Sequence, residues 1–491
     1  MSNNIRLRFP PSPTGKIHIG NMRTALFNWL VAKQKDGELV LRIEDTDQER
    51  STKEFEDIII KEMNWLGLNA DEGVGIGGDN GPYRQTERID IYEKYAQKLL
   101  DSGYAYKCYC TKEELEEMRQ KAIENDEMPR YDGSCRNLTE EERKQYEAEG
   151  REPVIRFKLP KEEREIIVED LIRGDVSFSS SVLDDFIIFK SDGMPTYNFA
   201  VVIDDALMNI SHVIRGEDHI SNTPKQILIY EALGFDLPEF AHLPLILDEN
   251  KAKLKKRGED SVYIGEFREQ GYLPEALFNF MALLGWAPGD EEEILSKEEI
   301  IERFAVEDIN KSGAVFDREK LNWMNGKYIR AADLDRIVEL SIPFLLDSGL
   351  VDKDYIENNK NWIKKVVDEA RTGVDYLAQI PEEAELFLTE IEFDAPKEAA
   401  EEFKGEDVKL VFETLKEKIL AKEELNVETV GEIFKELKNE QDVGGRTIYH
   451  PTRLAVTGKG SGPEMTSVIS IFGAEEVARR LDSALKLAKN N

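Results

Sequence analysis

The stretch Pro10-Pro-Ser-Pro-Thr-Gly-Lys-Ile-His-Ile-Gly20 decides the fold of the N-terminal part of the chain. It follows Ile5-Arg-Leu-Arg-Phe9, a short run with strand character. After it, apolar residues recur at helical spacing from Met22 to Leu30. Proline and glycine between the two runs are typical of a tight turn. The sequence therefore predicts a strand, a turn and a helix that begins near His18.

Such a junction is suited to anions, because the first N–H groups of a helix are unpaired and its dipole is positive there. Gly15 and Gly20 would let a phosphate approach the backbone, and His18 in the first turn can donate a hydrogen bond to a phosphoryl oxygen. The alternative is an ordinary strand–turn–helix with a histidine that faces solvent. The length and composition of the string favour the phosphate site.

The alternation of strands and helices continues along the chain. A second strand is predicted over 38–43 and a helix over 55–66, which together indicate a parallel α/β sheet. Residues 105–180 are irregular, with capping boxes that start helices at Thr111 and Thr139, and are predicted to be an inserted domain. The rhythm resumes over 186–214, and Thr223 and Pro224 are expected to open another helix.

Beyond residue 260 the strand signals largely vanish and patterns rich in Leu, Lys and Glu predict helices. We expect loops or linkers over 352–360 and 398–406. With 491 residues the chain exceeds what one hydrophobic core usually organises, so two or more domains are expected. Hydrophobic residues make up 41% of the chain, enough for globular domains.

The net charge of -34 taken alone argues against a nucleic-acid partner, since phosphate binding depends on Lys and Arg. A local basic segment within 251–257 could still contact phosphates although the whole chain is acidic. The alternative is a run of charged residues solvated at the surface. The segment holds Lys251, Lys253, Lys255, Lys256 and Arg257. No apolar stretch is long enough to span a bilayer, and we expect a cytoplasmic protein without a membrane partner.

The chain has three cysteines, Cys108, Cys110 and Cys135, all within one short window. An odd, sparse count without a secretory signal favours reduced thiols. Clustering favours a metal site, because three thiolates with a fourth protein ligand suit tetrahedral zinc. Buried reduced cysteines are the alternative.

The string from Pro11 to Gly20 resembles the first signature of class I aminoacyl-tRNA synthetases, in the form typical of the glutamyl and glutaminyl branch. The core of this signature has four positions, here His18 to Asn21, and the fourth is Asn21 rather than His, a variation found in this branch. The second signature of the family resembles Lys253-Leu-Lys-Lys-Arg257, with Lys255 where Ser is usual. The resemblance covers nearly the whole chain and implies a Rossmann-like parallel-sheet catalytic domain split by an α+β insertion, followed by all-α stem-contact and anticodon-binding domains.

The resemblance implies roles for particular residues. His18, Lys253 and Lys256 would be catalytic. ATP would be bound by Ser12, Thr14, Gly15, His18, Gly20, Lys253, Lys256 and Arg257. Glutamate would be bound by Arg8, Ser12, Glu44, Tyr197 and Arg215. Some members hold zinc with residues that correspond to Cys108, Cys110, Tyr131 and Cys135. Arg453 and Thr457 resemble anticodon contacts, with helix packing as the alternative.

The choice of arginine has a physical reason. A side-chain carboxylate in a pocket needs a permanently charged, planar donor that can bind it with two hydrogen bonds. Arg8 lies on the predicted strand that precedes the first signature. Arg215 directly follows the predicted run that ends at residue 214. The alternative for each arginine is an ion pair with a structural Asp or Glu.

The resemblance, together with these patterns, implies the domain boundaries. We expect a catalytic domain in two halves, 1–107 and 186–255, around an acceptor-stem-binding insertion, 108–185. A stem-contact helical domain, 256–330, and an α-helical anticodon-binding domain, 331–491, would follow.

The resemblance implies a glutamate–tRNA ligase that uses ATP and Mg²⁺, with tRNA(Glu), ATP and L-glutamate as partners, and we expect a monomer. Two rivals remain. One is a nucleotidylyltransferase that works without tRNA, which would lack the helical third of the chain. The other is a tRNA-binding paralogue without catalysis, which would be expected to lose His18 or Lys256.

Overall fold

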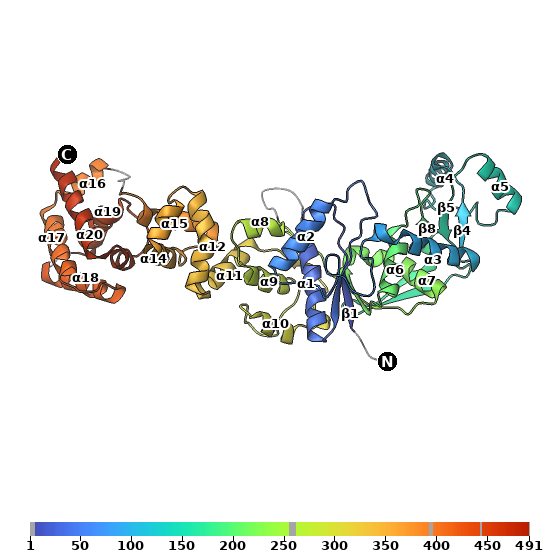
Figure 1. The fold of residues 1–491 in the computed structure, drawn as a ribbon, viewed down its shortest axis with the longest axis horizontal. Helices are drawn as coiled ribbons and strands as arrows, with labels where there is room; N and C mark the ends of the chain where they lie inside the picture. Colours follow the sequence, from blue (N-terminus) through green and yellow to red (C-terminus); the bar gives the residue numbers. More distant parts are fainter. Residues whose placement is uncertain (1–4, 255–261, 392–395, 442–443, 491) are drawn as a thin grey trace. The chain divides into compact units, whose positions relative to one another are not determined.

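The computed structural model describes residues 5–254, 262–391, 396–441 and 444–490 (Figure 1). Lys255, Lys256 and Arg257 of the predicted second signature lie outside the described residues. The chain divides into two compact units. The first comprises Met1–Glu269 and Pro274–Leu321, and the second comprises Gln270–Leu273 and Asn322–Asn491.

The first unit opens with the predicted strand, turn and helix. Strand β1 (Arg6–Phe9) pairs in parallel with β2 (Glu38–Leu41), which pairs in parallel with β3 (Glu72–Gly73). Helix α1 (Ile19–Gln34) begins directly after His18, as its sequence predicts. Its apolar face is buried because Met22, Leu26, Trp29 and Leu30 all pack into the core. The second predicted helix is α2 (Lys53–Trp65).

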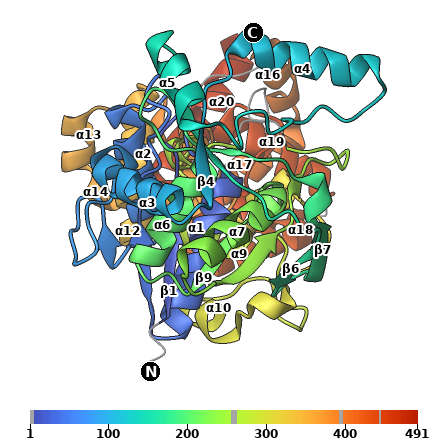
Figure 2. The same ribbon diagram turned by 90° about the vertical axis from the view of Figure 1, so that its right-hand side faces the viewer.

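A second sheet has the strand order β7-β6-β10-β9, and Figure 2 shows β6 beside β7. Its strands are β6 (Glu165–Asp170), β7 (Gly174–Ser179), β9 (His212–Gly216) and β10 (Glu239–Leu243). β9 and β10 are parallel, whereas β6 and β7 form an antiparallel hairpin. The hairpin, which lies within the predicted insertion, thus joins a sheet of the catalytic region through the parallel pair β6 and β10.

The rest of the insertion is α+β, as predicted. Three antiparallel strands, in the order β4-β5-β8, span Ala105–Cys108, Val154–Phe157 and Ile187–Phe189. This sheet extends beyond the predicted bounds of 108–185, because β8, which was expected to resume the α/β alternation, pairs antiparallel with β5. Helices α4 (Lys112–Glu124) and α5 (Glu140–Ala148) both begin with the predicted capping boxes, at Thr111 and Thr139.

Helices pack around these sheets. Helix α6 spans Tyr197–Leu207. Thr223 and Pro224 open helix α7 (Thr223–Leu233), as predicted, and the residue that caps α7 is Asn222. The remaining named elements of the first unit are α3 (Ile89–Asp101), β11 (Ile246–Leu247), α8 (Ile264–Glu269), α9 (Pro274–Ala282), α10 (Lys297–Arg303) and β12 (Ala314–Val315). Helix α11 (Arg318–Ala331) begins in the first unit and continues into the second.

The second unit is helical in its described residues, which confirms the predicted all-α region. Its helices after α11 are α12 (Leu334–Asp347), α13 (Lys353–Asn358), α14 (Lys360–Ala370), α15 (Ile380–Leu388), α16 (Pro396–Phe403), α17 (Glu406–Leu420), α18 (Val427–Gln441), α19 (Gly445–Thr457) and α20 (Met465–Asn490). Among the described helices, none combines the length and apolar character needed to cross a bilayer.

Two predicted linkers are wrong. Residues 352–360 contain α13, and 398–406 contain most of α16. The polar composition suggested loops, but Ala399, Ala400 and Phe403 share one buried helical face in α16. One apolar face suffices to dock a short helix, because its remaining residues can face water.

Candidate active site

The turn after β1, the first turn of α1 and the end of β9 line a cavity of about 450 Å³. Most of the residues predicted from sequence meet there. The cavity is lined by the predicted residues Arg8, Ser12, Thr14, His18, Gly20, Glu44, Tyr197, Arg215 and Lys253. Gly15 is not among the lining residues. A concave site that gathers cations and hydrogen-bond donors is chemically suited to a phosphorylated ligand.

His18 is the N-cap of α1. Its Nδ1 accepts hydrogen bonds from the backbone N–H of Gly20, at 3.1 Å, and of Asn21, at 3.4 Å. Because Nδ1 acts as the acceptor, the proton of the neutral imidazole is on Nε2. Nε2 is thus the nitrogen able to donate to a phosphoryl oxygen, so that the cap selects the tautomer that the predicted chemistry needs.

The two glycines of the turn differ in what the protein requires of them. A Cβ on Gly20 would lie 3.1 Å from both Cε1 and Nδ1 of His18, so a side chain there would push the imidazole. A Cβ on Gly15 would meet nothing within 4 Å. Packing among the described residues therefore does not demand glycine at position 15, and the open space is compatible with a bound ligand.

Arg8 is almost fully buried on β1 and is paired with an acid. Its Nε lies 3.3 Å from each carboxylate oxygen of Asp205, and its Nη1 donates to the carbonyl of Ile214 at 3.4 Å. Arg42 donates to the same carboxylate at 2.7 Å. The ion pair considered as an alternative for Arg8 is thus present, yet Arg8 also lines the cavity. Structural pairing and ligand binding are compatible, because the guanidinium has five N–H donors.

Glu44 reaches the cavity from the segment that follows β2. Its carboxylate lies 3.3 Å from Nη2 of Arg42, and the side chain is buried. Burial raises the pKa of Glu44 to about 7, despite the opposing charges of Arg42 and Arg8. An acid with a pKa near neutrality can gain stability as a carboxylate when a cationic group binds beside it.

Arg215 lies at the end of β9 and is held from several sides. Its Nη2 donates to the hydroxyl of Thr223 at 2.8 Å and to the amide oxygen of Gln226 at 2.9 Å. Its Nη1 lies 3.4 Å from the hydroxyl of Tyr197, and its Nε donates to His242 at 3.1 Å. These contacts place the guanidinium rigidly at the cavity wall.

His219 also lines the cavity, although it was not among the residues predicted from the sequence. Its Nδ1 lies 3.1 Å from the Tyr197 hydroxyl. Burial, followed by the charge of Arg215, lowers the pKa of His219 to about 4, so the imidazole is neutral. The signal available in the sequence was its position four residues after Arg215, which was predicted to bind glutamate.

Lys253 also lines the cavity, although it is far from the first signature in sequence. Its backbone bridges to Leu247 of β11, which brings the beginning of the second signature to the same cavity as His18. The side chain is exposed, which is compatible both with contact to a ligand and with the solvated surface run considered as the alternative.

Comparison with known proteins decides the family. Residues 4–323 match the family described as "tRNA synthetases class I (E and Q), catalytic domain", in which E and Q denote glutamate and glutamine. The chain belongs to this family of class I tRNA synthetases. Residues 336–485 of the synthetase further match the family described as "Anticodon binding domain".

Relatives of the synthetase span its full length. It is 53% identical to glutamate–tRNA ligase 2 of Caldanaerobacter subterraneus, over 98% of this chain and 99% of the relative. It is 52% identical to glutamate–tRNA ligase 1 of a Thermoanaerobacter species, over 99% of this chain and 100% of the relative. A crystal structure of a glutamate tRNA ligase from Elizabethkingia meningosepticum in complex with its amino acid superposes with a TM-score of 0.88, 35% identity and 99% coverage of both chains.

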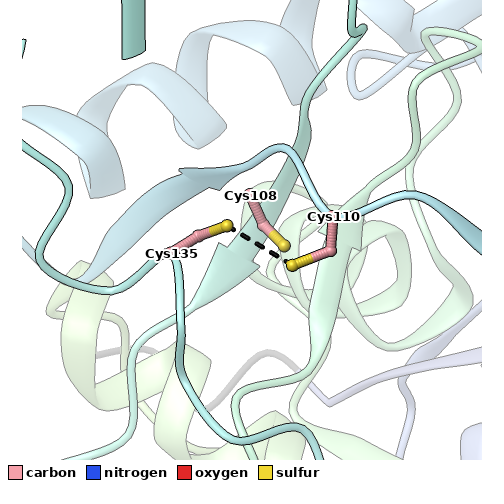
Figure 3. Close-up of side chains that lie close together, drawn as sticks. All are labelled: Cys108, Cys110 and Cys135. Atoms are coloured by element: carbon pink, nitrogen blue, oxygen red, sulfur yellow. Dashed lines mark hydrogen bonds between the residues drawn. The ribbon is translucent and has the colours of Figure 1, made fainter. Parts of the chain in front are cut away.

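The three cysteines of the synthetase lie together in the insertion, as Figure 3 shows. Their sulfur atoms all lie within 4.8 Å of one another, and the Sγ atoms of Cys110 and Cys135 are 3.4 Å apart. The Tyr131 hydroxyl is 3.4 Å from Sγ of Cys108 and 3.9 Å from Sγ of Cys110. Three sulfurs bound to one tetrahedral metal would be about 3.8 Å apart, so this group could hold a metal ion.

The three thiols share hydrogen bonds that affect their protonation. The thiols of Cys110 and Cys135 hold the pKa of Cys108 far below its usual range by hydrogen bonding to its sulfur, and the same contact raises the pKa of Cys110 far above its usual range. A thiolate is the form that binds metals. The guanidinium of Arg156 stacks 3.9 Å from the ring centre of Tyr131, which fixes the tyrosine beside the cluster.

The predicted anticodon residues of the synthetase lie at the end of α19. Arg453 is partly exposed, and its Nη1 donates to the carbonyl of Pro463 at 2.7 Å. Thr457 is buried, and its hydroxyl donates to the Arg453 carbonyl and accepts from the Lys459 N–H. Both groups therefore have roles in closing the helix end, which favours the packing alternative for Thr457. Thr457 also lines a cavity of about 420 Å³ together with Lys459 and Arg480.

Proposed function

We propose that this synthetase is a glutamate–tRNA ligase, which activates L-glutamate with ATP and transfers it to tRNA(Glu). Its relatives of 49% to 53% identity over 97% or more of the chain include several named glutamate–tRNA ligases. One observation supports the assignment above the others. A single cavity is lined by buried arginines suited to a carboxylate and by His18 and Lys253, which are suited to phosphates.

The first reaction step needs little proton transfer. The α-carboxylate of glutamate is already an anionic nucleophile that can attack the α-phosphorus of ATP, with pyrophosphate as the leaving group. The barrier lies in the approach of two anions, so positioning and cationic donors carry the catalysis. His18 through Nε2, Lys253 and Lys256 would contact the phosphates, together with Ser12, Thr14, Gly15, Gly20 and Arg257. Mg²⁺ bound with ATP would neutralise further phosphate charge.

The amino acid would lie deeper in the same cavity. Arg8 and Arg215 supply planar cationic donors for its side-chain carboxylate, with the Tyr197 hydroxyl beside Arg215. Glu44, as a carboxylate, would bind the ammonium group of glutamate. Ser12 would contact the α-amino acid portion of the same substrate. The glutamyl group would then move from the adenylate to the 2′-hydroxyl of the terminal tRNA adenosine, with release of AMP.

The parts of the chain would divide the tRNA between them. The insertion, 108–185, would bind the acceptor stem, residues 256–330 would contact the stem, and 331–491 would bind the anticodon loop. Arg453 is the candidate for an anticodon contact, with Thr457 shaping the turn that holds it. We expect the enzyme to act as a monomer in the cytoplasm.

The cysteine cluster would hold a structural zinc ion. Cys108, Cys110 and Cys135 would supply three thiolates and Tyr131 the fourth ligand. The cluster lies at the end of β4, where the insertion begins, so the ion would brace the base of the insertion.

An ATP–pyrophosphate exchange assay with glutamate, run with and without tRNA(Glu), tests the proposal. We expect exchange only when tRNA is present, and charging of tRNA(Glu) in a parallel aminoacylation assay. Exchange that is independent of tRNA would favour the nucleotidylyltransferase. Failure of both reactions under either condition would favour the non-catalytic paralogue.

A further inference from the structure

Behind Arg215 lies a buried pair of ionisable side chains that the proposed reaction does not use, Asp170 of β6 and His242 of β10. Both are fully withdrawn from solvent. We propose that Asp170 and His242 are positioning residues, which set the orientation of Arg215 and thereby the selection of glutamate. This inference rests on the proposed role of Arg215 in binding the substrate carboxylate.

The three side chains form a continuous chain of hydrogen bonds. Nδ1 of His242 lies 2.6 Å from Oδ2 of Asp170, and the backbone N–H of His242 donates to the same oxygen at 3.0 Å. On the other side of the ring, Nε2 of His242 lies 3.1 Å from Nε of Arg215. The imidazole therefore joins a buried carboxylate directly to the guanidinium at the cavity wall.

Arginine decides the protonation of the histidine. Because Nε of Arg215 always carries a proton, Nε2 of His242 must accept, and the proton of the ring is on Nδ1. Burial lowers the pKa of His242, although the hydrogen bond to Asp170 opposes this effect, and the ring is neutral. The proton on Nδ1 then points at Asp170, which has the acceptor that this tautomer requires.

Asp170 is itself fixed as a carboxylate. Its Oδ1 accepts from the backbone N–H groups of Ile172, at 3.0 Å, and Arg173, at 2.8 Å. Burial alone would raise the pKa of Asp170, but the hydrogen bonds from His242 and these amides outweigh burial and hold the pKa below its usual range. A carboxylate that accepts four hydrogen bonds cannot rotate, so it holds the imidazole in one plane.

The consequence concerns the part of Arg215 that faces the cavity. Nε is held by His242, and both N–H groups of Nη2 are directed to Thr223 and Gln226. Nη1, beside the Tyr197 hydroxyl, is the nitrogen left to reach a ligand in the cavity. If His242 no longer accepted the hydrogen bond from Nε, the guanidinium could rotate about its long axis. Nη1 would then no longer be fixed toward the ligand.

Two near-isosteric substitutions separate the two halves of the relay. In His242→Asn the amide nitrogen takes the place of Nδ1 and can still donate to Asp170, but nothing reaches Arg215. In His242→Gln the amide oxygen can take the place of Nε2 and accept from Arg215, but the contact with Asp170 is lost. We expect His242→Asn to raise the KM for glutamate about tenfold or more, since a hydrogen bond to a charged group is lost. His242→Gln should largely rescue that KM.

The assay is ATP–pyrophosphate exchange by the full-length enzyme with tRNA present, with KM measured for both glutamate and ATP. A purely structural role predicts equal losses in both variants, or equal effects on the two substrates, and either result overturns the proposal. His212→Asn and His212→Gln are matched controls at the start of β9, outside the cavity lining, and should leave both KM values unchanged.

Two further measurements keep the outcomes distinct. If Arg215→Ala leaves the KM for glutamate unchanged, the proposed role of Arg215 fails rather than the relay alone. In the unmodified enzyme, ¹⁵N spectra of the five histidines should show His242 as a neutral ring protonated on Nδ1. A ring protonated on Nε2 or on both nitrogens would refute the relay even if every variant folded poorly.

Discussion

Arg8 and Asp205 form a buried pair beneath the cavity, with Nε of the arginine 3.3 Å from each carboxylate oxygen. Asp205 also accepts from Arg42 at 2.7 Å, so one carboxylate lies between two guanidinium groups. A buried charge is tolerated when it is paired and hydrogen-bonded. Asp205 thus holds Arg8 at the cavity through Nε, while Nη1 of the arginine donates to the carbonyl of Ile214.

Arg8→Ala should impair glutamate binding far more than ATP binding. Asp205 keeps its bond to Arg42 in the variant, so the cavity retains a paired carboxylate. We expect kcat/KM for glutamate to fall about 100-fold and the KM for ATP to change less than about threefold. Arg6→Ala is the control, because Arg6 is a buried arginine on the same strand that pairs with Glu38 and Glu72 outside the cavity. Equal loss for both substrates in Arg8→Ala would remove the assignment.

His18→Asn should separate the two roles of the histidine. An asparagine oxygen can accept from the N–H groups of Gly20 and Asn21 and so replace the cap, but it cannot supply the donor at Nε2. We expect kcat for exchange to fall about 100-fold to 1000-fold, with the midpoint of thermal unfolding almost unchanged. His18→Ala should lose the same activity and also about 1 kcal/mol of stability. Retention of activity in His18→Asn would contradict a role in phosphate contact.

The KM for glutamate should depend on pH through Glu44. The pKa of Glu44 is raised to about 7, and the substrate ammonium requires the carboxylate form. We therefore expect the KM to rise about tenfold between about pH 8 and pH 6. Glu44→Gln should have a high KM at every pH and no such rise. A parent enzyme whose KM is constant over this range would contradict the assignment.

Glu44 should also reduce stability at alkaline pH. Below its ordinary pKa of 4.5 the group is protonated in both folded and unfolded states, so its ionisation does not change the free energy of unfolding. Between 4.5 and about 7 the unfolded state releases the proton first, so the stability contribution falls as pH rises. Relative to the parent, Glu44→Gln should gain about 3 kcal/mol in free energy of unfolding across that window. Denaturant titrations at several pH values measure the gain, and a constant difference would rule it out.

Zinc content should follow the cysteine cluster. Cys108→Ser and Cys135→Ser should reduce bound zinc from one ion per chain to almost none, as measured by elemental analysis of the purified protein. Tyr131→Phe should weaken zinc binding by at least about tenfold if the hydroxyl is the fourth ligand. Ser134→Ala is the control, since its hydroxyl lies 3.4 Å from Sγ of Cys110 without belonging to the proposed ligand set. Exchange activity should survive zinc loss better than tRNA charging, and a parent protein without zinc would refute the site.

Local pattern predicted the parts of the site that are local. The strand, the turn and the helix that begins after His18 were all predictable, because strand alternation, turn residues and helical spacing act over a few positions. The capping boxes at Thr111 and Thr139 were predictable for the same reason. The helices α13 and α16 were missed because their composition is polar and only their packing shows the buried face.

By itself the sequence determined the α/β and all-α parts of this protein and most of the charged groups that meet in the cavity, although not His219. Only the tertiary structure decided how those groups are held. Asp205 lies 197 positions from Arg8, and Asp170 lies 72 positions from His242, so no local pattern links either pair. Burial supplies the physical reason, since it removes water as a partner and obliges each charged or polar group to find its counterpart wherever the fold brings one.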